Sequence, residues 1–155
     1  MKITAQEEYG LRCLLQLAQA DAQQGMTVKE IAAQEGLSSA YVEKLLRFLA
    51  KGGIIHSVRG IHGGYLLSRE TKQISLGEVV RALGSLPTTE EICDRHPGNR
   101  TSCVHIDDCC IRSAWATLAD AIQGFMEKVY ISDLVGPEKK VRQSLQQRIT
   151  TSFSV

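Results

Sequence analysis

The sequence has no long hydrophobic run and almost no net charge. Nothing in it approaches the roughly 18 consecutive apolar residues of a membrane-spanning helix, so we expect no membrane partner. The formal net charge is only +1, so no global field indicates a particular charged partner. The first residues, MKITAQEEYGLRCLLQLAQ, carry glutamates ahead of the apolar residues and lack the pattern of a secretory signal. We therefore expect a cytoplasmic protein.

The sequence also lacks the motifs of common enzyme classes. It has no glycine-rich phosphate loop, no Ser-His-Asp arrangement and no paired carboxylates in a pattern that defines a pocket. Hydrophobic content of 43% and charged content of 23% are ordinary for a globular chain. We expect no enzymatic activity and no small-molecule substrate.

Cysteine is scarce but concentrated. Four of the five cysteines lie within CDRHPGNRTSCVHIDDCC, from Cys93 to Cys110. A disulfide framework is not expected, because the cytoplasm keeps thiols reduced and the number of cysteines is odd. The spacing also lacks the close cysteine pairs of most structural zinc sites. Three thiolates in an irregular segment suit an iron–sulfur cluster, and zinc binding or a thiol redox switch remain as alternatives.

Apolar residues recur at three- and four-residue steps in several short segments, which predicts helices. One covers residues 6–21, and a second is TVKEIAAQEG, where Thr27 and Glu30 have the spacing of a capping box. A third helix follows a serine cap in LSSAYVEKLLRFLAKGG and ends at its glycine pair. Two short helices joined by EGLS have the outline of a helix-turn-helix.

The pattern changes after the third helix. The β-prone runs IIHSV and GYLLS are separated by the glycine-rich RGIHG, which predicts a two-stranded hairpin. SLGEVVRALG then reads as a further short helix capped by Ser75. A hairpin directly behind a helix-turn-helix predicts a mainly α protein with a winged helix-turn-helix DNA-binding domain, which we place at residues 1–85.

The second half divides into three parts. Residues 86–106 are predicted to be a cysteine-rich cluster-binding loop, and residues 107–135 a dimerisation segment with a long helix over about 107–129. Residues 136–155 form a polar C-terminal tail that we expect to fray. The long helix carries an apolar stripe, the expected dimer seam, which comprises Ile111, Ala114, Trp115, Leu118, Ile122, Phe125 and Val129.

Local charge indicates a DNA-binding face that the net charge conceals. Between residues 38 and 72, six basic residues outnumber two acidic ones, a local charge of +4 that attracts phosphates. The third helix suits the major groove, and Arg59 at the wing tip suits a narrow minor groove. Because helix-turn-helix proteins usually bind two half-sites, we expect a homodimer on a double-stranded DNA operator. The predicted DNA contacts are Ser38, Ser39, Tyr41, Glu43, Lys44, Arg47, Arg59, Gly60, His62, Gly63 and Gly64.

The segments VKEIAAQEGLSSAYVEKLLRFLAKGGIIHSVRGIHGGYLL and ISLGEVVRAL resemble the Rrf-two family of winged-helix regulators, which includes IscR, NsrR and RirA. The most specific marker is SVRGIHGGYLL, the wing of that family. The resemblance implies a homodimer with two winged-helix heads, a dimerisation helix and a cluster in the loop before that helix. It also implies a transcriptional regulator, expected to be a repressor, that responds to iron or cluster supply, redox state or nitric oxide.

The resemblance further implies a ligand set. Cys93, Cys103 and Cys109 match the three cysteines of cluster-binding members. IscR-like members place a histidine three residues after the last cysteine, where this chain has Arg112. NsrR-like members use an aspartate of the first helix, donated by the partner subunit, and Glu8 occupies the corresponding position. We therefore expect a [4Fe-4S] or [2Fe-2S] cluster bound by the three cysteines and Glu8.

Alternatives stay open at this stage. Cys110 and His105 are further candidates for the fourth ligand, and a glutamate such as Glu8 is also favoured in a first helical turn by the helix dipole. Cys13 is expected to be buried packing in the first helix. The second class of function is a cluster-free winged-helix regulator, controlled by a protein partner, as in a cysteine-metabolism branch of the family, or by zinc or thiol chemistry.

Overall fold

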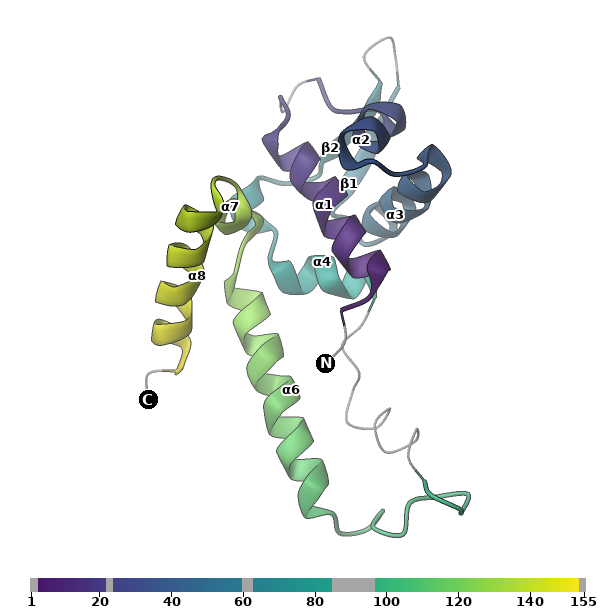
Figure 1. The fold of residues 1–155 in the computed structure, drawn as a ribbon, viewed down its shortest axis with the longest axis vertical. Helices are drawn as coiled ribbons and strands as arrows, with labels where there is room; N and C mark the ends of the chain where they lie inside the picture. The colour runs from purple at the N-terminus through teal and green to yellow at the C-terminus, as the bar shows by residue number, and fades with distance from the viewer. Residues whose placement is uncertain (1–2, 22–23, 60–62, 85–96, 154–155) are drawn as a thin grey trace.

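The computed structural model describes residues 3–21, 24–59, 63–84 and 97–153. The four short helices and the hairpin expected in the first half are confirmed, and the fold is mainly α (Figure 1). Within the described ranges, no helix combines the length and the hydropathy that crossing a bilayer would require. In chain order the elements are α1 (Ala5–Gln19), α2 (Val28–Glu35), α3 (Ser39–Lys51), β1 (Ile55–Val58), β2 (Gly64–Leu67), η1 (Thr71–Gln73), α4 (Leu76–Leu83), α6 (Cys110–Lys128), α7 (Ile131–Leu134) and α8 (Glu138–Phe153).

The predicted helix caps are confirmed. The Thr27 hydroxyl accepts the backbone N–H of Glu30, and the Glu30 carboxylate accepts the N–H of Thr27, which is a complete capping box. Ser75 and Glu78 form the same arrangement at the start of α4. The hydrogen bond from the Thr27 backbone holds the pKa of Glu30 below its usual range. Each such cap stabilises the fold by about 1 kcal/mol. Because the capping residues lie within four positions of each other, the start of each helix can be predicted from the local sequence.

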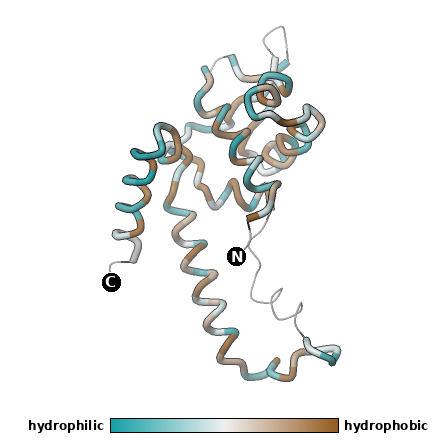
Figure 2. The backbone as a smooth tube through the Cα atoms, in the orientation of Figure 1, coloured by the Kyte–Doolittle hydropathy of each residue, from teal (hydrophilic) through white to brown (hydrophobic). Residues whose placement is uncertain are grey.

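The core lies where α1, α2, α3, α4 and the hairpin meet. Figure 2 shows hydrophobic and hydrophilic residues alternating along these helices, as one-sided burial requires. Cys13 has no exposed surface, and burial raises the pKa of its thiol to about 11, so it packs as a small apolar group, as expected. The largest fully buried side chains are Leu14, Ile31, Leu45, Leu46, Leu49, Ile54, Ile55, Ile74, Leu83, Ile131, Val42 and Val79.

The hairpin is fixed to the segment that precedes α2. Strands β1 and β2 pair antiparallel, from Ile55 opposite Leu67 to Val58 opposite Gly64. The backbone of Tyr65 donates to Met26 O at 2.8 Å and accepts from Met26 N at 3.1 Å. These two bonds extend the hairpin by one bridge, so the wing cannot shift freely relative to the helix-turn-helix.

The long helix α6 is joined to the winged-helix body at its C-terminal end and extends away from it (Figure 1). The N–H of Leu76 donates to Val129 O at 2.7 Å, and the N–H of Ile131 donates to Ile74 O at 3.0 Å. The residues around Val129 are therefore hydrogen-bonded to the start of α4 and to the segment just before it. Val129 itself is fully buried.

Glu127 adds side-chain contacts to this joint. Its carboxylate accepts a hydrogen bond from the Ser75 hydroxyl at 3.1 Å and forms an ion pair with Arg81. A Cβ placed on Gly77 would lie 2.5 Å from Glu127 Oε1, so a larger residue there would require the Glu127 carboxylate to move. The bond from Arg81 lowers the pKa of Glu127, an effect that its partial burial opposes.

The expectation that residues 136–155 fray is wrong, because residues 138–153 form α8. The Arg148 guanidinium donates to the backbone oxygen of Lys128 at 2.8 Å and pairs with Asp133 at 2.8 Å. It also lies 5.8 Å from the centre of the Tyr130 ring. A polar helix is thus held by tertiary partners at the end of α6 and in α7. The long helix α6 begins at Cys110, later than expected, because Cys109 is its N-cap.

Gly10→Ala tests the contact between α1 and α4. The added Cβ would lie 2.3 Å from Leu83 Cδ2 in the core, so we expect overpacking to lower the free energy of unfolding by about 1–3 kcal/mol. Gly124→Ala in α6 is the matched control, because a Cβ there meets nothing within 4 Å and alanine favours helix by about 1 kcal/mol. Urea unfolding followed by circular dichroism measures both; equal midpoints for Gly10→Ala and the wild type would contradict this packing.

Glu127→Gln tests the joint between α4 and α6. The neutral amide weakens the bonds to Arg81 and Ser75, so we expect a loss of about 1 kcal/mol at neutral pH. Because the folded-state pKa of Glu127 is lowered, its contribution is present above the ordinary carboxylate pKa and disappears as pH falls through the folded-state value. Thermal unfolding from pH 7 to pH 3 should show the variant and the wild type converging in acid. Glu138→Gln, at an exposed pair with Arg142, should change little at any pH.

Candidate nucleic-acid interface and cysteine segment

Helices α2 and α3 are joined by a tight turn that requires glycine. Gly36 ends α2 with φ of 66°, in the left-handed region where other residues are strained. Ser38 follows as the N-cap of α3, and its hydroxyl accepts the N–H of Tyr41. The Ser38 side chain is therefore engaged in holding the helix start, although the residue is exposed. This is the helix-turn-helix that EGLS predicts.

Helix α3 has one buried and one exposed face. The core takes Val42, Leu45, Leu46 and Leu49, and the opposite face exposes the predicted contacts Ser39, Glu43, Lys44 and Arg47 together with Lys51. Arg47 pairs with Glu43 at 2.6 Å, and the Lys44 ammonium lies 5.9 Å from the Phe48 ring centre. The structure thus brings the predicted polar side chains of α3 onto one surface.

Tyr41 differs from the other predicted contacts because it is partly buried. Its ring meets Tyr9 of α1 edge to face, with centroids 6.1 Å apart. The Arg12 guanidinium lies 5.3 Å from the Tyr9 ring centre, and it pairs with Glu35 at 2.6 Å. Tyr41 therefore helps to fix α3 against α1 as well as bordering the exposed face, a packing role that sequence reasoning missed.

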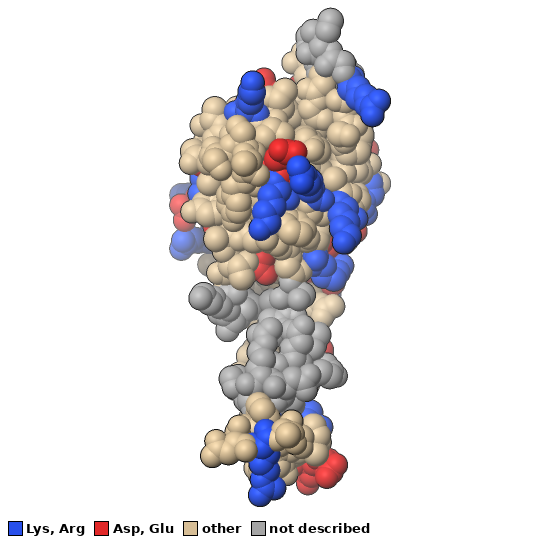
Figure 3. Space-filling model, turned by 90° about the vertical axis from the view of Figure 1, so that its right-hand side faces the viewer, with Lys and Arg blue, Asp and Glu red and all other residues tan. Residues whose placement is uncertain are grey.

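Fewer basic side chains are available for DNA than the count between residues 38 and 72 predicts. Arg69 pairs with Glu78 at 2.8 Å and Lys72 with Glu70 at 2.7 Å, so local carboxylates compensate both. Figure 3 shows lysine and arginine side chains gathered on the face that α3 occupies, around an acidic side chain. Among the described residues, the basic side chains of this region that form no ion pair are Lys44, Lys51 and Arg59.

The wing begins with exposed Arg59, directly after β1. Gly60 and His62, two further predicted contacts, lie outside the described residues. Gly63 and Gly64 are described, and Gly64 has a packing requirement that the sequence did not reveal. A Cβ on Gly64 would lie 2.5 Å from the backbone oxygen of Met26, so this glycine allows the wing to approach the start of α2.

Two of the predicted cysteine ligands lie on one irregular segment. Residues 97–109 contain turns and bends but no helix or strand. Cys103 and Cys109 on this segment are free thiols with partial exposure, and neighbouring Cys110 is exposed. Cys109 is also the N-cap of α6, and its Sγ accepts the N–H of Arg112 at 3.4 Å. Cys93, the third predicted ligand, lies outside the described residues.

Glu8 lies in α1, in the winged-helix body, and is exposed. The segment 97–109 lies at the opposite end of α6 (Figure 1). Within the described part of one chain, no three His, Cys, Asp or Glu side chains come together in a way that could hold a metal. Neither His105 nor Cys110 changes this result, so a single chain does not assemble the predicted ligand set from its described residues.

Arg112 is the functional candidate that sequence reasoning missed. Its guanidinium donates to the backbone oxygens of His105, at 3.1 Å, and of Ile106. Its Nε is buried and has no acceptor among the described residues. The sequence shows only that Arg112 lies three residues after Cys109. That position does not predict that its side chain bonds to the backbone of the loop.

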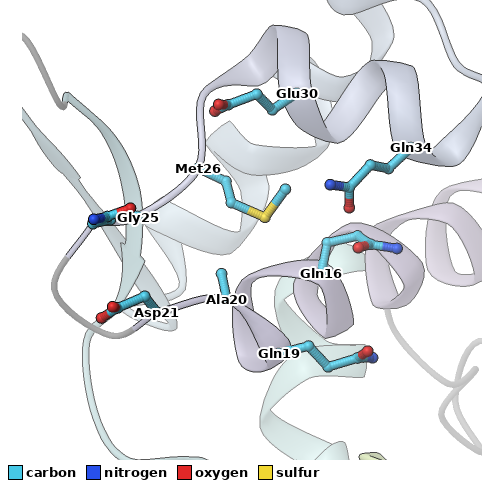
Figure 4. A pocket seen from close by; sticks show the side chains of 9 residues that line it. Gln16, Gln19, Ala20, Asp21, Gly25, Met26, Glu30 and Gln34 are labelled. Atoms are coloured by element: carbon cyan, nitrogen blue, oxygen red, sulfur yellow. The ribbon is translucent and has the colours of Figure 1, made fainter.

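A polar cavity of about 320 Å³ lies elsewhere, between the end of α1 and α2. Figure 4 shows Gln16, Met26 and Gln34 converging on it. Gln16 and Glu30 already have partners, because Gln16 donates to Glu35 at 2.5 Å and Glu30 belongs to the capping box of α2. Two of the polar groups that line the cavity are therefore already engaged within the protein.

Comparison with known proteins agrees with this architecture. The family described as Rrf2, iron-dependent transcriptional regulator, matches residues 3–137. The protein rrf2 of Nitratidesulfovibrio vulgaris is 35% identical over 135 residues, which is 87% of each chain. The HTH-type transcriptional regulator IscR of Cronobacter sakazakii is 29% identical over 147 residues, 95% of this chain and 88% of that protein.

Solved structures show the same likeness. IscR of T. potens superposes with a TM-score of 0.69 at 27% identity, covering 87% of this chain and 86% of that one. CymR, described as the global cysteine regulator of B. subtilis, has a TM-score of 0.69 at 27% identity, covering 86% and 95%. The chain therefore belongs to the Rrf2 family of transcriptional regulators, which are DNA-binding proteins and not enzymes.

Proposed function

We propose that this regulator is a homodimeric repressor whose operator binding is controlled by an iron–sulfur cluster, held by Cys93, Cys103 and Cys109 of one subunit and Glu8 of the other. The observation that carries the proposal is the pair of free, partly exposed thiols on one irregular segment at the start of α6. The match to a family described as iron-dependent supports iron as the metal. A cytoplasmic location follows from the need to reach DNA.

The exposed face of α6 supports the homodimer. Ile111, Trp115 and Leu118 are 60%, 48% and 50% exposed, although they lie at helical spacing along one stripe. Large apolar side chains that share one helix face are typical of a surface that a partner covers. Pairing two such helices would place the loop of each subunit near the other winged-helix body. Glu8 of one subunit could then reach the loop of the other, although Glu8 and the loop are far apart within one chain.

The donor set fits the proposed group. Thiolates are the ligands that iron–sulfur clusters prefer, and a carboxylate completes the set with a harder oxygen donor. Cys109 faces the positive end of a 19-residue helix and accepts a backbone N–H, which suits an anionic sulfur ligand. The cluster would supply sensitivity to iron supply, oxidants or nitric oxide. The loop, α6 and the joint at Glu127 would carry that state to the DNA-binding heads.

The DNA-binding mode follows from the exposed face. We propose that α3 enters the major groove through Ser39, Glu43, Lys44 and Arg47, with the start of α3 near a phosphate. Arg59 would enter the minor groove beside it, with the glycines of the wing close to the backbone. Two heads of a dimer would then bind half-sites about one helical turn apart.

A second candidate is a cluster-free regulator controlled by a protein partner, or by zinc or thiol chemistry. The structural likeness to CymR, a cysteine regulator, favours it as strongly as the likeness to IscR favours the first. The cysteines distinguish the cluster from control by a protein partner, because control by a partner does not need free thiols gathered on one segment. Iron content and colour distinguish the cluster from zinc or thiol chemistry.

Iron content and colour test the cluster. The protein purified without oxygen should be coloured and contain iron, and Cys103→Ser or Cys109→Ser should remove both, because each takes away a thiolate ligand. Cys110→Ser tests the alternative fourth ligand: colour and iron should remain if Glu8 completes the set, and both should fall if Cys110 is a ligand. A colourless protein holding stoichiometric zinc would contradict the cluster while leaving DNA binding intact.

Arg59→Ala tests the wing. If the side chain enters a groove, operator binding should weaken by about 1–3 kcal/mol. Lys139→Ala is the matched control. It removes an exposed positive charge from α8, which is outside the proposed DNA-binding surface, and should leave the affinity unchanged. Fluorescence anisotropy with a labelled operator measures both at fixed salt. Equal affinity of Arg59→Ala and the wild type would remove Arg59 from the interface.

A further inference from the structure

The first turn of α6 is tied to the middle of the cysteine loop by one side chain. The Arg112 guanidinium donates to the backbone oxygens of His105 and Ile106, which lie between Cys103 and Cys109. The backbone N–H of the same residue donates to Cys109 Sγ at 3.4 Å. One residue therefore contacts both the loop backbone and a candidate ligand sulfur.

These contacts shape an otherwise unsupported segment. Between Cys103 and Cys109, the backbone hydrogen bond found is from the N–H of Ile106 to the oxygen of Cys103 at 3.2 Å. Val104 and Ile106 are 61% and 48% exposed, so apolar burial does not hold this loop. A planar guanidinium can donate several hydrogen bonds in fixed directions, which suits it to bridge two carbonyl oxygens.

The Nε donor of Arg112 is buried without a partner in the described residues. A buried donor without an acceptor is destabilising, so such a group often indicates an acceptor that the site receives when loaded. Charge points the same way. Asp107 and Asp108 on the loop are acidic, and every proposed ligand of the cluster is an anion. A fixed cation at this place offsets negative charge that would otherwise accumulate.

We propose that Arg112 is the positioning residue of the cysteine site: it holds Cys103 and Cys109 in one loop conformation and provides the positive charge that a net-negative cluster requires. This inference rests on the proposed function for its second half only. The clamp on the loop exists whether or not iron binds. Two variants separate these roles. Arg112→Lys keeps the positive charge and loses the planar guanidinium that bonds to both carbonyl oxygens, and Arg112→Gln loses the charge as well.

Hydrogen–deuterium exchange of the iron-free, reduced protein tests the clamp. In both variants the amide of Ile106, which is bonded to Cys103 O, should exchange about tenfold faster, because the bonds from Arg112 no longer oppose opening of the loop. Peptides from α1 to α4 should be unchanged, since the hydrogen bonds of Arg112 to described residues all lie within the loop. Arg142→Gln on α8 is the matched control, an exposed arginine whose loss should leave the loop unaffected. Unchanged loop exchange in both variants would overturn the clamp.

Spectroscopy of the iron-loaded protein tests the charge. Arg112→Gln should release its cluster faster. It should also shift the reduction potential of the cluster to more negative values, because the positive charge that stabilises the reduced form is gone. Arg112→Lys should keep the wild-type potential while still losing the cluster faster. Wild-type potential and cluster lifetime in Arg112→Gln would overturn the role toward the cluster. If the wild type takes up no iron while loop exchange responds as expected, the proposed cluster fails and the clamp stands.

Discussion

The structure depends on the joint that fixes the C-terminal end of α6 to the winged-helix body. Backbone bonds on both sides of Val129 and the carboxylate of Glu127 connect the end of α6 to α4. A 19-residue helix spans roughly 28 Å, so the segment at its other end lies far from the DNA-binding face. A regular helix transmits orientation with little bending, because its backbone bonds are satisfied internally. This joint is therefore one route by which the cysteine segment could act on the head of its own chain.

Local patterns predicted the winged-helix half because its determinants are local. Capping boxes such as Thr27 with Glu30 lie within one helical turn, and the apolar stripe of α3 follows the helical period. The C-terminal half was predicted less well because its determinants lie far apart in the chain. Helix α8 has few apolar residues, and it is held by Arg148 through Asp133 and the end of α6, contacts that no window of local sequence contains.

The candidate site shows the same division. Residue types and spacing identified the cysteines and the exposed residues of α3. They did not show that Arg69 and Lys72 are already paired, which reduces the basic face to fewer side chains than the local charge of +4 implies. They also could not show that Gly64 lies against the backbone of Met26, or that Arg112 donates to the backbone of the loop. Each of these depends on which distant groups the fold brings into contact, and residue counts contain no such information.

Under the proposed function, dimerisation and cofactor binding become one event. Within a single chain Glu8 belongs to the winged-helix body, while Cys103 and Cys109 lie at the far end of α6 (Figure 1). A site that draws ligands from both elements would be complete only when two chains pair, and pairing along α6 would also cover the exposed Trp115 and Leu118. Binding energy at the cluster would then stabilise one relative position of the two subunits, by as much as the site prefers that position over others. Because each head is attached to its own α6 at the Glu127 joint, that preference would act directly on the spacing of the two recognition helices.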